Sequence, residues 1–217
     1  MAKDIVGKTM KYFGDKLKRH YIKKHGVEVL DKIREVSKST GKAIWLDYGT
    51  LLGAYREHGF IPHDNDMDVA MYASDYDYDF ERALFDHGFK ILRQFTIINA
   101  NKIEDRHITE LTLKYKQVQI DLFLKFRTNN STFGILWQQE DEKRNVWKAF
   151  RDYFDYTGFH EIDFLDSKAI IPDNTKDFLV AKYGDNFMTP IANWQPPKKI
   201  YLPTEEYYGE VIGGWIA

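Results

Sequence analysis

Apolar residues recur along this chain at helical spacing in some segments and in short continuous runs in others. The clearest helical stripe consists of Val27, Leu30, Ile33 and Val36. This three-residue spacing predicts a helix over 27–39, and Gly41 is placed to end it. Shorter helices are predicted over 51–57, 75–87, 143–155 and 176–182.

Short apolar runs between these helices predict β-strands. The runs cover 43–46, 66–72, 89–98, 108–115 and 118–126, and residues 133–137 are a candidate edge strand. Prolines from 190 to 203 predict an extended C-terminal tail, which could instead wrap around the core. Together the elements predict an α+β fold in which helices flank a mixed β-sheet. We assign 1–40 to a basic N-terminal helical segment and 41–217 to the domain with its tail.

The composition fits a soluble globular domain. The chain of 217 residues can bury a substantial core, and 43% hydrophobic with 29% charged residues is ordinary for a soluble protein. Cysteine is absent, which excludes disulfides and thiolate metal sites and fits a reducing compartment. The sequence shows neither a signal-peptide core nor an apolar run of membrane-spanning length. We therefore expect a cytoplasmic protein.

The formal net charge of −2 conceals a basic segment at the N-terminus. Residues 1–25 contain eight lysine or arginine residues and only two aspartates. A solvated helix face is the ordinary explanation of such a segment. The alternatives are contact with anionic lipid at the inner face of a membrane, or with an anionic substrate. Peripheral membrane attachment through 1–25 therefore stays open.

Alternating acidic residues stand at the start of the predicted strand 66–72. Asp66 and Asp68 are two residues apart, so their carboxylates point to the same face of a strand and repel each other unless a cation compensates them. Mg²⁺ takes oxygen ligands of this kind and leaves positions open for phosphate oxygens. The pair is a candidate site for Mg²⁺, with Mn²⁺ as the alternative, although acidic strand ends are also common without a metal.

Two further features point to the same chemistry. Gly49 and Thr50 follow a predicted strand, and at such a turn backbone N–H groups and a hydroxyl can hold a phosphate. Asp121 interrupts the apolar run 118–126, where burial of a carboxylate is costly unless a cation or hydrogen bonds compensate it. The polar side of an edge strand would also accommodate it. Three carboxylates beside a phosphate-holding turn suit metal-assisted phosphoryl or nucleotidyl transfer.

The stretch GTLLGAYREHGFIPHDNDMDVAMY, residues 49–72, closely resembles the LicD family of the nucleotidyltransferase-like superfamily, to which fukutin and fukutin-related protein are related. In the superfamily pattern a Gly-Ser/Thr turn precedes an Asp-x-Asp/Glu strand, and a third acidic residue follows on a later strand. The residues that match in this order are Gly49-Thr50, Asp66-x-Asp68 and Asp121.

Two other segments extend the resemblance over roughly 46–197. LicD-type sequences commonly read Trp-Asp-Asp-Asp-Ile-Asp where this chain reads HDNDMD, residues 63–68, so the alternating acids are kept. The segment FLVAKYGDNFMTP, residues 178–190, is similar to a recurrent segment of the family. The resemblance implies a nucleotidyltransferase-like fold.

The resemblance also implies a reaction. Family members transfer a phosphorylated alcohol, such as phosphocholine or ribitol phosphate, from a CDP-linked donor to a sugar hydroxyl of a cell-surface glycan such as lipopolysaccharide or capsule, and CMP leaves. On this basis Asp66, Asp68 and Asp121 are the expected catalytic residues and metal ligands, and Asp121 accepts the proton of the attacking hydroxyl. Gly49 and Thr50 would hold a donor phosphate. We expect no nucleic-acid partner.

Neighbouring polar residues have two explanations each. Arg56 either clamps a phosphate oxygen or is a solvated helix residue. Asp64 either orients a metal ligand or caps a loop. We count both as candidate substrate-binding residues. Asp47 is expected to cap the turn, and His63 to be an exposed loop residue rather than a proton-transfer group.

The sequence leaves the donor open. Phosphocholine is our first expectation, because aromatic cages bind quaternary ammonium groups and the second half of the chain offers Tyr153, Phe154 and Tyr156. These rings suit a hydrophobic core as well, and ribitol or glycerol phosphate would instead need hydroxyl-binding groups. Two alternatives remain: nucleotidyl transfer from a nucleoside triphosphate with release of pyrophosphate, and a catalytically idle glycan-binding module.

Overall fold

The computed structural model describes the backbone of residues 2–99, 102–141, 146–191, 202–203 and 207–213, and side chains within 12–97, 107–138 and 149–191. Its helices are α1 (Ala2–Thr40), α2 (Tyr48–Arg56), α3 (Tyr78–Asp86) and α4 (Thr175–Tyr183), with a 3₁₀ turn at Ala73–Asp75. Its strands are β1 (Trp45–Leu46), β2 (Met67–Tyr72), β3 (Lys90–Asn99), β4 (Lys102–Tyr115), β5 (Val118–Arg127), β6 (Thr132–Asp141), β7 (Val146–Tyr153), β8 (Phe159–Phe164), β9 (Ser167–Pro172), β10 (Leu202–Pro203) and β11 (Tyr207–Gly213).

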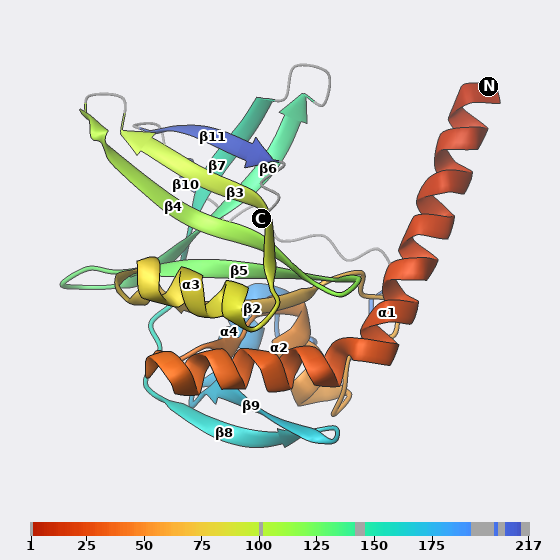
Figure 1. Cartoon of the computed structure of the whole chain (residues 1–217), viewed down its shortest axis with the longest axis horizontal. Helices are drawn as coiled ribbons and strands as arrows, with labels where there is room; N and C mark the ends of the chain where they lie inside the picture. The colour runs from red at the N-terminus through yellow and green to blue at the C-terminus, as the bar shows by residue number, and fades with distance from the viewer. Residues whose placement is uncertain (1, 100–101, 142–145, 192–201, 204–206, 214–217) are drawn as a thin grey trace.

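Nine of the described strands form one sheet, and β5 connects its two parts (Figure 1). The strand order is β10-β7-β6-β5-β4-β3-β11, and β1 and β2 extend the sheet beside β5. The pairs are antiparallel except for β2 and β5, which run parallel. Most of β5 pairs with β2, and its end at Phe126 and Arg127 pairs with β6. The α+β fold with a mixed sheet flanked by helices is therefore confirmed.

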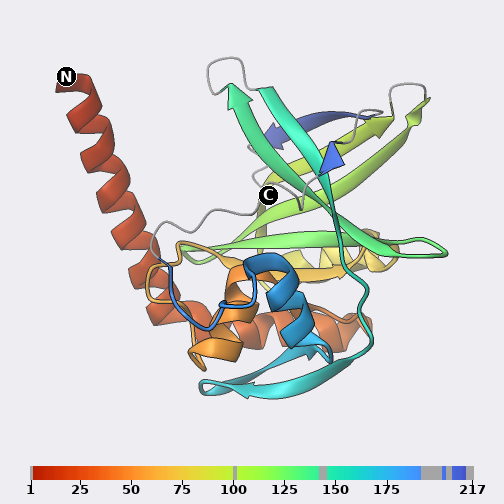
Figure 2. The same cartoon turned by 180° about the vertical axis from the view of Figure 1, so that it is seen from behind.

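Helices cover both sides of the β2–β5 part of the sheet. In Figure 1, α3 and the C-terminal part of α1 lie in front of it, and α2 and α4 lie on the opposite side, which faces the viewer in Figure 2. The largest fully buried side chains lie in these layers and in the adjoining β8–β9 hairpin: Trp45, Phe80, Phe89, Phe164 and Phe178. Burial of each such side chain stabilises the fold by roughly 2 kcal/mol, so these layers contribute much of the stability of the molecule.

Helix α1 has two parts with different surroundings. Its C-terminal part packs on the domain through buried side chains such as Val29, Leu30 and Val36. Its N-terminal part projects away from the body (Figure 1), and there Phe13 and Leu17 are exposed. The helix predicted over 27–39 is confirmed. The observed helix begins far earlier, at Ala2.

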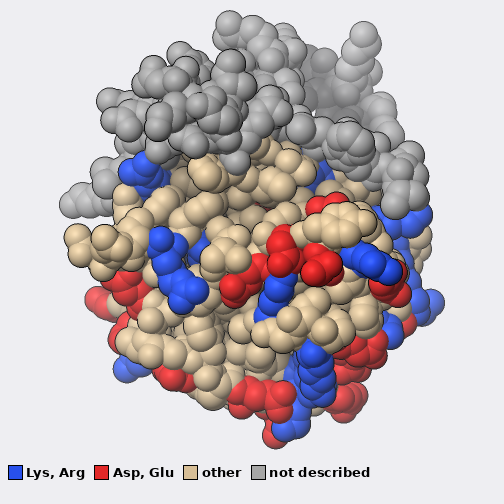
Figure 3. Space-filling view, turned by 60° about the vertical axis from the view of Figure 1, so that its left-hand side comes forward, with Lys and Arg blue, Asp and Glu red and all other residues tan. Residues whose placement is uncertain are grey.

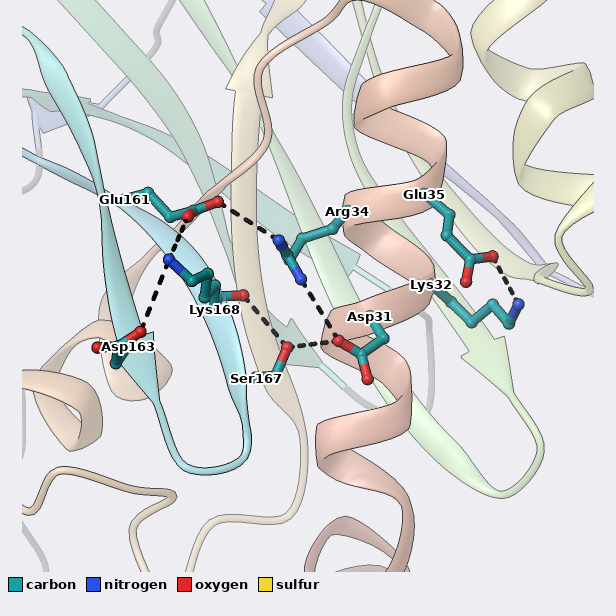
Figure 4. Close-up of polar contacts among 8 residues, drawn as sticks. All are labelled: Asp31, Lys32, Arg34, Glu35, Glu161, Asp163, Ser167 and Lys168. Carbon is teal, nitrogen blue, oxygen red and sulfur yellow. Dashed lines mark hydrogen bonds and ion pairs between the residues drawn. The ribbon is translucent and has the colours of Figure 1, made fainter.

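Polar contacts attach α1 to the β8–β9 hairpin (Figure 4). Ser167 Oγ donates a hydrogen bond to Asp31 Oδ1 over 2.6 Å, and Arg34 lies 3.5 Å from Glu161. On the hairpin itself Lys168 pairs with Glu161 at 2.9 Å. Solvent screens exposed ion pairs of this kind, so they orient the hairpin more than they hold the fold together.

Two predictions about the region after β5 are wrong. The helix predicted over 143–155 is not formed, because the described part of that range contains β7. Residues 133–137 lie in β6, which is an interior strand between β5 and β7 rather than an edge strand. Aromatic residues at 147, 150 and 153 are three apart and imitate a helical stripe, but pairing with β6 overrides this local pattern. The β8–β9 hairpin was not predicted at all.

The other elements lie within a few residues of their predicted ranges, except that the described part of β4 begins six residues early. Two differences in the bounds of elements matter for function. Helix α2 begins at Tyr48, three residues earlier than predicted, so Gly49 and Thr50 lie in its first turn. Strand β2 begins at Met67, so Asp66 stands just before the strand. The predicted tail falls partly on 192–201 and 204–206, outside the described residues, and the described β10 and β11 join the sheet. The division at residue 40 stays a prediction.

Charged side chains of both signs are interspersed on the face of the molecule shown in Figure 3, where acidic groups near the centre have basic groups on either side. This mixture agrees with the small formal net charge of −2. Within the part of the chain that the structure describes, no helix combines the length and apolar character needed to cross a membrane.

Substitution of Gly53 tests how tightly α2 packs. A Cβ at this position would lie 2.5 Å from the Gly59 carbonyl oxygen and 3.1 Å from the Ile61 nitrogen, and backbone atoms cannot rotate away as side chains do. We expect Gly53→Ala to lower the free energy of unfolding by about 2 kcal/mol, measured by urea denaturation. Gly14→Ala is the control, because a Cβ there meets nothing within 4 Å. Equal stability of the two variants would contradict the packing.

Candidate active site

Parallel pairing of β2 with β5 places Asp68 and Asp121 side by side. The two residues are direct partners in the strand register, and neighbouring strands lie about 4.8 Å apart. Asp66 stands in the bend just before β2, and its charge acts on both Asp68 and Asp121. The structure thus brings together the three carboxylates that the sequence singled out.

Residues 47–50 hold Asp68 through three hydrogen bonds. The backbone N–H of Asp47 donates to the Asp68 carbonyl oxygen over 3.0 Å. The backbone N–H of Gly49 donates to Asp68 Oδ2 over 2.9 Å, and Asp68 N–H donates to Thr50 Oγ1 over 2.8 Å. We call residues 47–50 the clamp. Two of its members, Gly49 and Thr50, were expected to hold a phosphate, and here they contact Asp68 instead.

Close packing explains glycine at position 49. A Cβ on Gly49 would lie 3.0 Å from Asp68 Oδ2 and 3.1 Å from Asp64 Oδ2. A side chain would therefore push on two carboxylates at once. Asp64 belongs to this group of acids, and the structure places it beside the clamp rather than in a remote loop.

Burial and mutual repulsion raise the pKa values of these carboxyl groups. Desolvation, followed by the charges of Asp66 and Asp121, raises the pKa of Asp68 well above its ordinary value. Desolvation and the Asp66 charge raise the pKa of Asp121 to about 6. The pKa of Asp64 also rises to about 6, first through desolvation and then through Asp66. Such groups favour any cation that compensates them.

The donor set fits a hard divalent cation by its chemistry. Asp68 and Asp121 offer carboxylate oxygens from two adjacent strands, and Asp66 offers its carboxylate from the bend before β2. Carboxylate oxygens are the ligands that Mg²⁺ and Mn²⁺ accept. Among the described side chains, however, no three acidic or histidine groups are already arranged as a metal site. Metal binding would therefore require rotation of these carboxylates toward a common centre.

A cleft of about 570 Å³ opens beside the clamp. Asp68, Gly49 and Asp64 contribute to its acidic end. The opposite wall comes from the segment after α4, with Phe187, Thr189, Pro190 and Ile191. A volume of this size suits a small phosphorylated molecule. Asp66 and Asp121 are not in its lining and lie at the side of Asp68.

Arg56 and His63 also line the cleft. The Arg56 guanidinium donates from Nη1 to the Phe187 carbonyl oxygen over 3.0 Å and pairs with Glu57 at 2.8 Å. Its side chain is only 9% exposed, so it is not a solvated helix residue. It connects α2 to the wall of the cleft. His63 is exposed, as expected, at the mouth.

Asp47 does not cap α2, contrary to expectation. It occupies the N-cap position, but its side chain makes no capping hydrogen bond. The carboxylate is fully buried and lies 2.6 Å from Lys125 Nζ, with which it forms an ion pair. The side chain therefore points behind the clamp, toward β5.

Glu110 is a buried carboxyl group near Asp121 that the sequence prediction missed. It lies on β4 opposite Phe123, one step along the same face from the Thr112–Asp121 pair. Desolvation and then the Asp121 charge raise the pKa of Glu110 to about 8. A charged residue in an apolar strand singled out Asp121, and the same signal in the run ITELTLKY would have found Glu110.

The aromatic residues proposed for a choline cage lie elsewhere. Phe154 and Tyr156 pack on Phe178, with ring centroids 5.0 and 6.1 Å away, and Tyr156 also contacts Trp45. Tyr153 is 42% exposed on β7 and packs on Phe133. None of the three lines the cleft described above. Core packing explains Phe154 and Tyr156.

The raised pKa of Asp121 predicts a dependence of stability on pH. The folded state binds a proton at Asp121 more tightly than the unfolded chain, so this contribution is complete below about pH 4 and is lost as the pH rises through about 6. We expect Asp121→Asn to be more stable than the parent protein at pH 7 by about 2 kcal/mol, in chelator, with little difference at pH 4. Chemical denaturation across this range measures the effect.

A matched control for this measurement is Asp163→Asn, because the Asp163 side chain is 88% exposed. Its free energy of unfolding should follow the parent protein at every pH. Parallel curves for the parent protein and Asp121→Asn would show that Asp121 is not a destabilised carboxylate.

The chain is similar in sequence to known proteins. The family model described as LicD/FKTN/FKRP, nucleotidyltransferase domain, matches residues 41–174. A protein of Mus musculus named ribitol-5-phosphate transferase FKTN is 30% identical over 173 residues, which cover 79% of this chain and 35% of the relative. Its Homo sapiens counterpart is 27% identical over the same length.

An uncharacterised protein of Caenorhabditis elegans is 36% identical over 120 residues, or 52% of this chain and 30% of the relative. The chain thus spans about a third of the length of the curated relatives that it matches. The family match covers more than half of the chain, including the clamp and all three carboxylates. The chain belongs to the LicD/FKTN/FKRP nucleotidyltransferase domain family.

Proposed function

We propose that this chain transfers a phosphorylated alcohol from a CDP-linked donor to a sugar hydroxyl of a glycan, with release of CMP. The alignment of Asp68 with Asp121 beside the Gly49 N–H, at the end of a cleft of about 570 Å³, is the observation that carries the proposal. Membership of the family and the names of the FKTN relatives support transfer of a phosphorylated alcohol.

In this proposal Asp66, Asp68 and Asp121 hold a divalent cation, Mg²⁺ or Mn²⁺. When bound, such a cation neutralises charge on a diphosphate and lowers the pKa of an acceptor hydroxyl. The clamp fixes Asp68 so that its Oδ2 cannot turn away from the site. Because Asp68 is already oriented, metal binding would require only the Asp66 and Asp121 carboxylates to rotate toward it.

Asp121 also receives a proton. The acceptor hydroxyl oxygen forms a bond to the donor phosphorus, the bond from that phosphorus to the CMP oxygen breaks, and CMP leaves with the electron pair. The hydroxyl proton passes to the Asp121 carboxylate, which lies beside Asp68 in the strand register. The segment after α4 and Arg56 form the other side of the cleft.

The names of the relatives and the lining of the cleft both help to rank the possible donors. The FKTN relatives are named as ribitol-5-phosphate transferases, which favours a polyol phosphate. The cleft also offers polar groups such as Thr189, His63 and Asp64 for hydroxyls. The rings proposed for a choline cage lie outside its lining. We therefore rank ribitol phosphate ahead of phosphocholine as the transferred group, with a cell-surface or other glycan as acceptor.

Substitution of Asp68 tests the proposed reaction. We expect Asp68→Asn or Asp66→Ala to reduce CMP release from a CDP-alcohol at least about 100-fold, because the cation loses a ligand, while the circular dichroism spectrum is unchanged. Asp163→Asn on the exposed hairpin should keep full activity. Chromatography of CMP and pyrophosphate gives the answer. Near-normal activity of Asp68→Asn, or pyrophosphate release from CTP instead of CMP release, would refute the proposal.

We also propose that the projecting part of α1 contacts an anionic lipid surface. Its exposed side chains combine lysines with apolar groups, the mixture that suits a membrane interface. They include Tyr12, Phe13, Lys16, Leu17, Lys23 and Lys24. A face of this composition would bring the cleft near glycolipid acceptors.

Charge reversal tests this contact. We expect replacement of Lys16, Lys23 and Lys24 by glutamate to abolish co-sedimentation with phosphatidylserine-containing vesicles in low salt, because about 1 kcal/mol of attraction per lysine is lost. The control replaces exposed Lys38, Lys90 and Lys176, which lie elsewhere on the molecule, and should bind as the parent protein does. Equal loss in both variants would mean non-specific attraction, and retained binding by the first would leave α1 a solvated helix.

A further inference from the structure

Two lysines and two aspartates are buried together behind the clamp. Each is 5% exposed or less: Asp47, Lys125, Asp152 and Lys182. They come from the β1–α2 junction, β5, β7 and α4, four segments that are distant in the sequence. Burial of a charge is costly unless it is paired. These four residues form two ion pairs, each between one lysine and one aspartate.

The first pair is Asp47 with Lys125, at 2.6 Å. Lys125 lies on the same face of β5 as Asp121, four residues away. It does not line the cleft. The second pair is Lys182 with Asp152, where the Lys182 ammonium donates to Asp152 Oδ1. The Lys182 ammonium also donates to the Tyr153 carbonyl oxygen over 3.3 Å, which fixes α4 to the end of β7.

The hydroxyl of Tyr48 joins the two pairs. It donates to Asp152 Oδ2 over 2.6 Å and accepts from Lys125 Nζ over 3.3 Å. The Lys125 ammonium also lies 4.5 Å from the centre of the Tyr48 ring, a cation–π distance. One phenol oxygen thus completes a chain of contacts from Asp47 to Lys182.

The backbone of Tyr48 is strained. Its φ is +34°, in the left-handed region that residues with a Cβ rarely adopt, and it immediately precedes Gly49. Such a conformation persists only where surrounding contacts hold it. The contacts of the Tyr48 ring with Phe123 and of its hydroxyl with Asp152 are of this kind. They turn the Gly49 N–H toward Asp68.

The same chain reaches the opposite wall of the cleft. Lys182 is followed by Tyr183 and, four residues later, by Phe187, and both line the cleft. The clamp and this wall are therefore attached to one another through Tyr48 and Asp152. Tyr48 itself lines the cleft, and its hydroxyl is the contact between the clamp and Asp152.

We propose that Tyr48 is a positioning residue of this site. Its hydroxyl joins the two buried ion pairs and so keeps the Gly49 N–H directed at Asp68. The same contacts keep the wall after α4 at a fixed position relative to the clamp. The role in turnover rests on the proposed function. The role in holding Gly49 does not.

Tyr48→Phe is the variant of choice. It removes the joining oxygen and keeps the ring, both ion pairs and every buried charge. Lys125→Met would instead leave the Asp47 carboxylate buried and unpaired, and the chain could fail to fold. Tyr76→Phe is the matched control, because the Tyr76 hydroxyl donates to Glu81 over 2.7 Å in α3, outside the cleft lining.

Amide hydrogen exchange, resolved by NMR in the uncleaved protein, is the primary measurement. We expect the Gly49 amide to exchange about tenfold faster in Tyr48→Phe than in the parent protein, since one buried hydrogen bond to a charged group is lost. Tyr76→Phe should leave Gly49 unchanged. An equal Gly49 exchange rate in Tyr48→Phe and the parent protein would overturn the proposal, whatever the activity.

Kinetics is the second measurement. For CMP release we expect Tyr48→Phe to lower kcat about tenfold with a smaller change in KM, because the carboxylate is misdirected while the cleft still binds the donor. Unchanged kcat with faster Gly49 exchange would refute the role in turnover. If the parent protein released CMP from no donor, the proposed function would fail, and the exchange result would still decide the role of Tyr48.

Discussion

The hydrogen bonds between residues 47–50 and Asp68 are the constraint on which the site depends. They attach the first turn of α2 to β2, and β2 in turn fixes Asp68 beside Asp121 through the parallel register. Helix α2 also carries Arg56, which reaches the far wall of the cleft. If the clamp were lost, Asp68, α2 and the wall after α4 would no longer be held in fixed positions relative to one another.

This arrangement concentrates negative charge where a folded chain is least able to tolerate it. Several carboxyl groups around Asp68 have raised pKa values because they are desolvated and repel each other. The buried lysines lie behind the clamp, where they pair with Asp47 and Asp152 rather than with the acids of the cleft. The two ion pairs thus neutralise the buried charges behind the clamp, while the pKa values of the acids in the cleft stay raised.

Much of this could be predicted from the sequence, and the failures have physical reasons. Residues 49–72 carry the turn, the strand and its acids within one local stretch, so spacing and the family resemblance singled out Gly49, Asp66 and Asp68. The helix begins earlier and the strand later than predicted, so Gly49 lies in α2 and Asp66 before β2. The helix predicted over 143–155 failed because strand pairing with β6 overrode a three-residue aromatic spacing. The link through Tyr48 and Lys182 joins residues more than a hundred positions apart, and no local pattern records such a contact.

The most direct test of the central claim is calorimetric titration of CDP-ribitol, CDP-glycerol, CDP-choline and CTP into the protein, with and without Mg²⁺. The carboxylates around the clamp predict that a CDP-alcohol binds and that binding weakens when Mg²⁺ is removed. The names of the FKTN relatives predict that CDP-ribitol binds more tightly than CDP-choline. Binding of CTP alone would move the account to nucleotidyl transfer. Absence of binding by all four compounds in the presence of Mg²⁺ would contradict it.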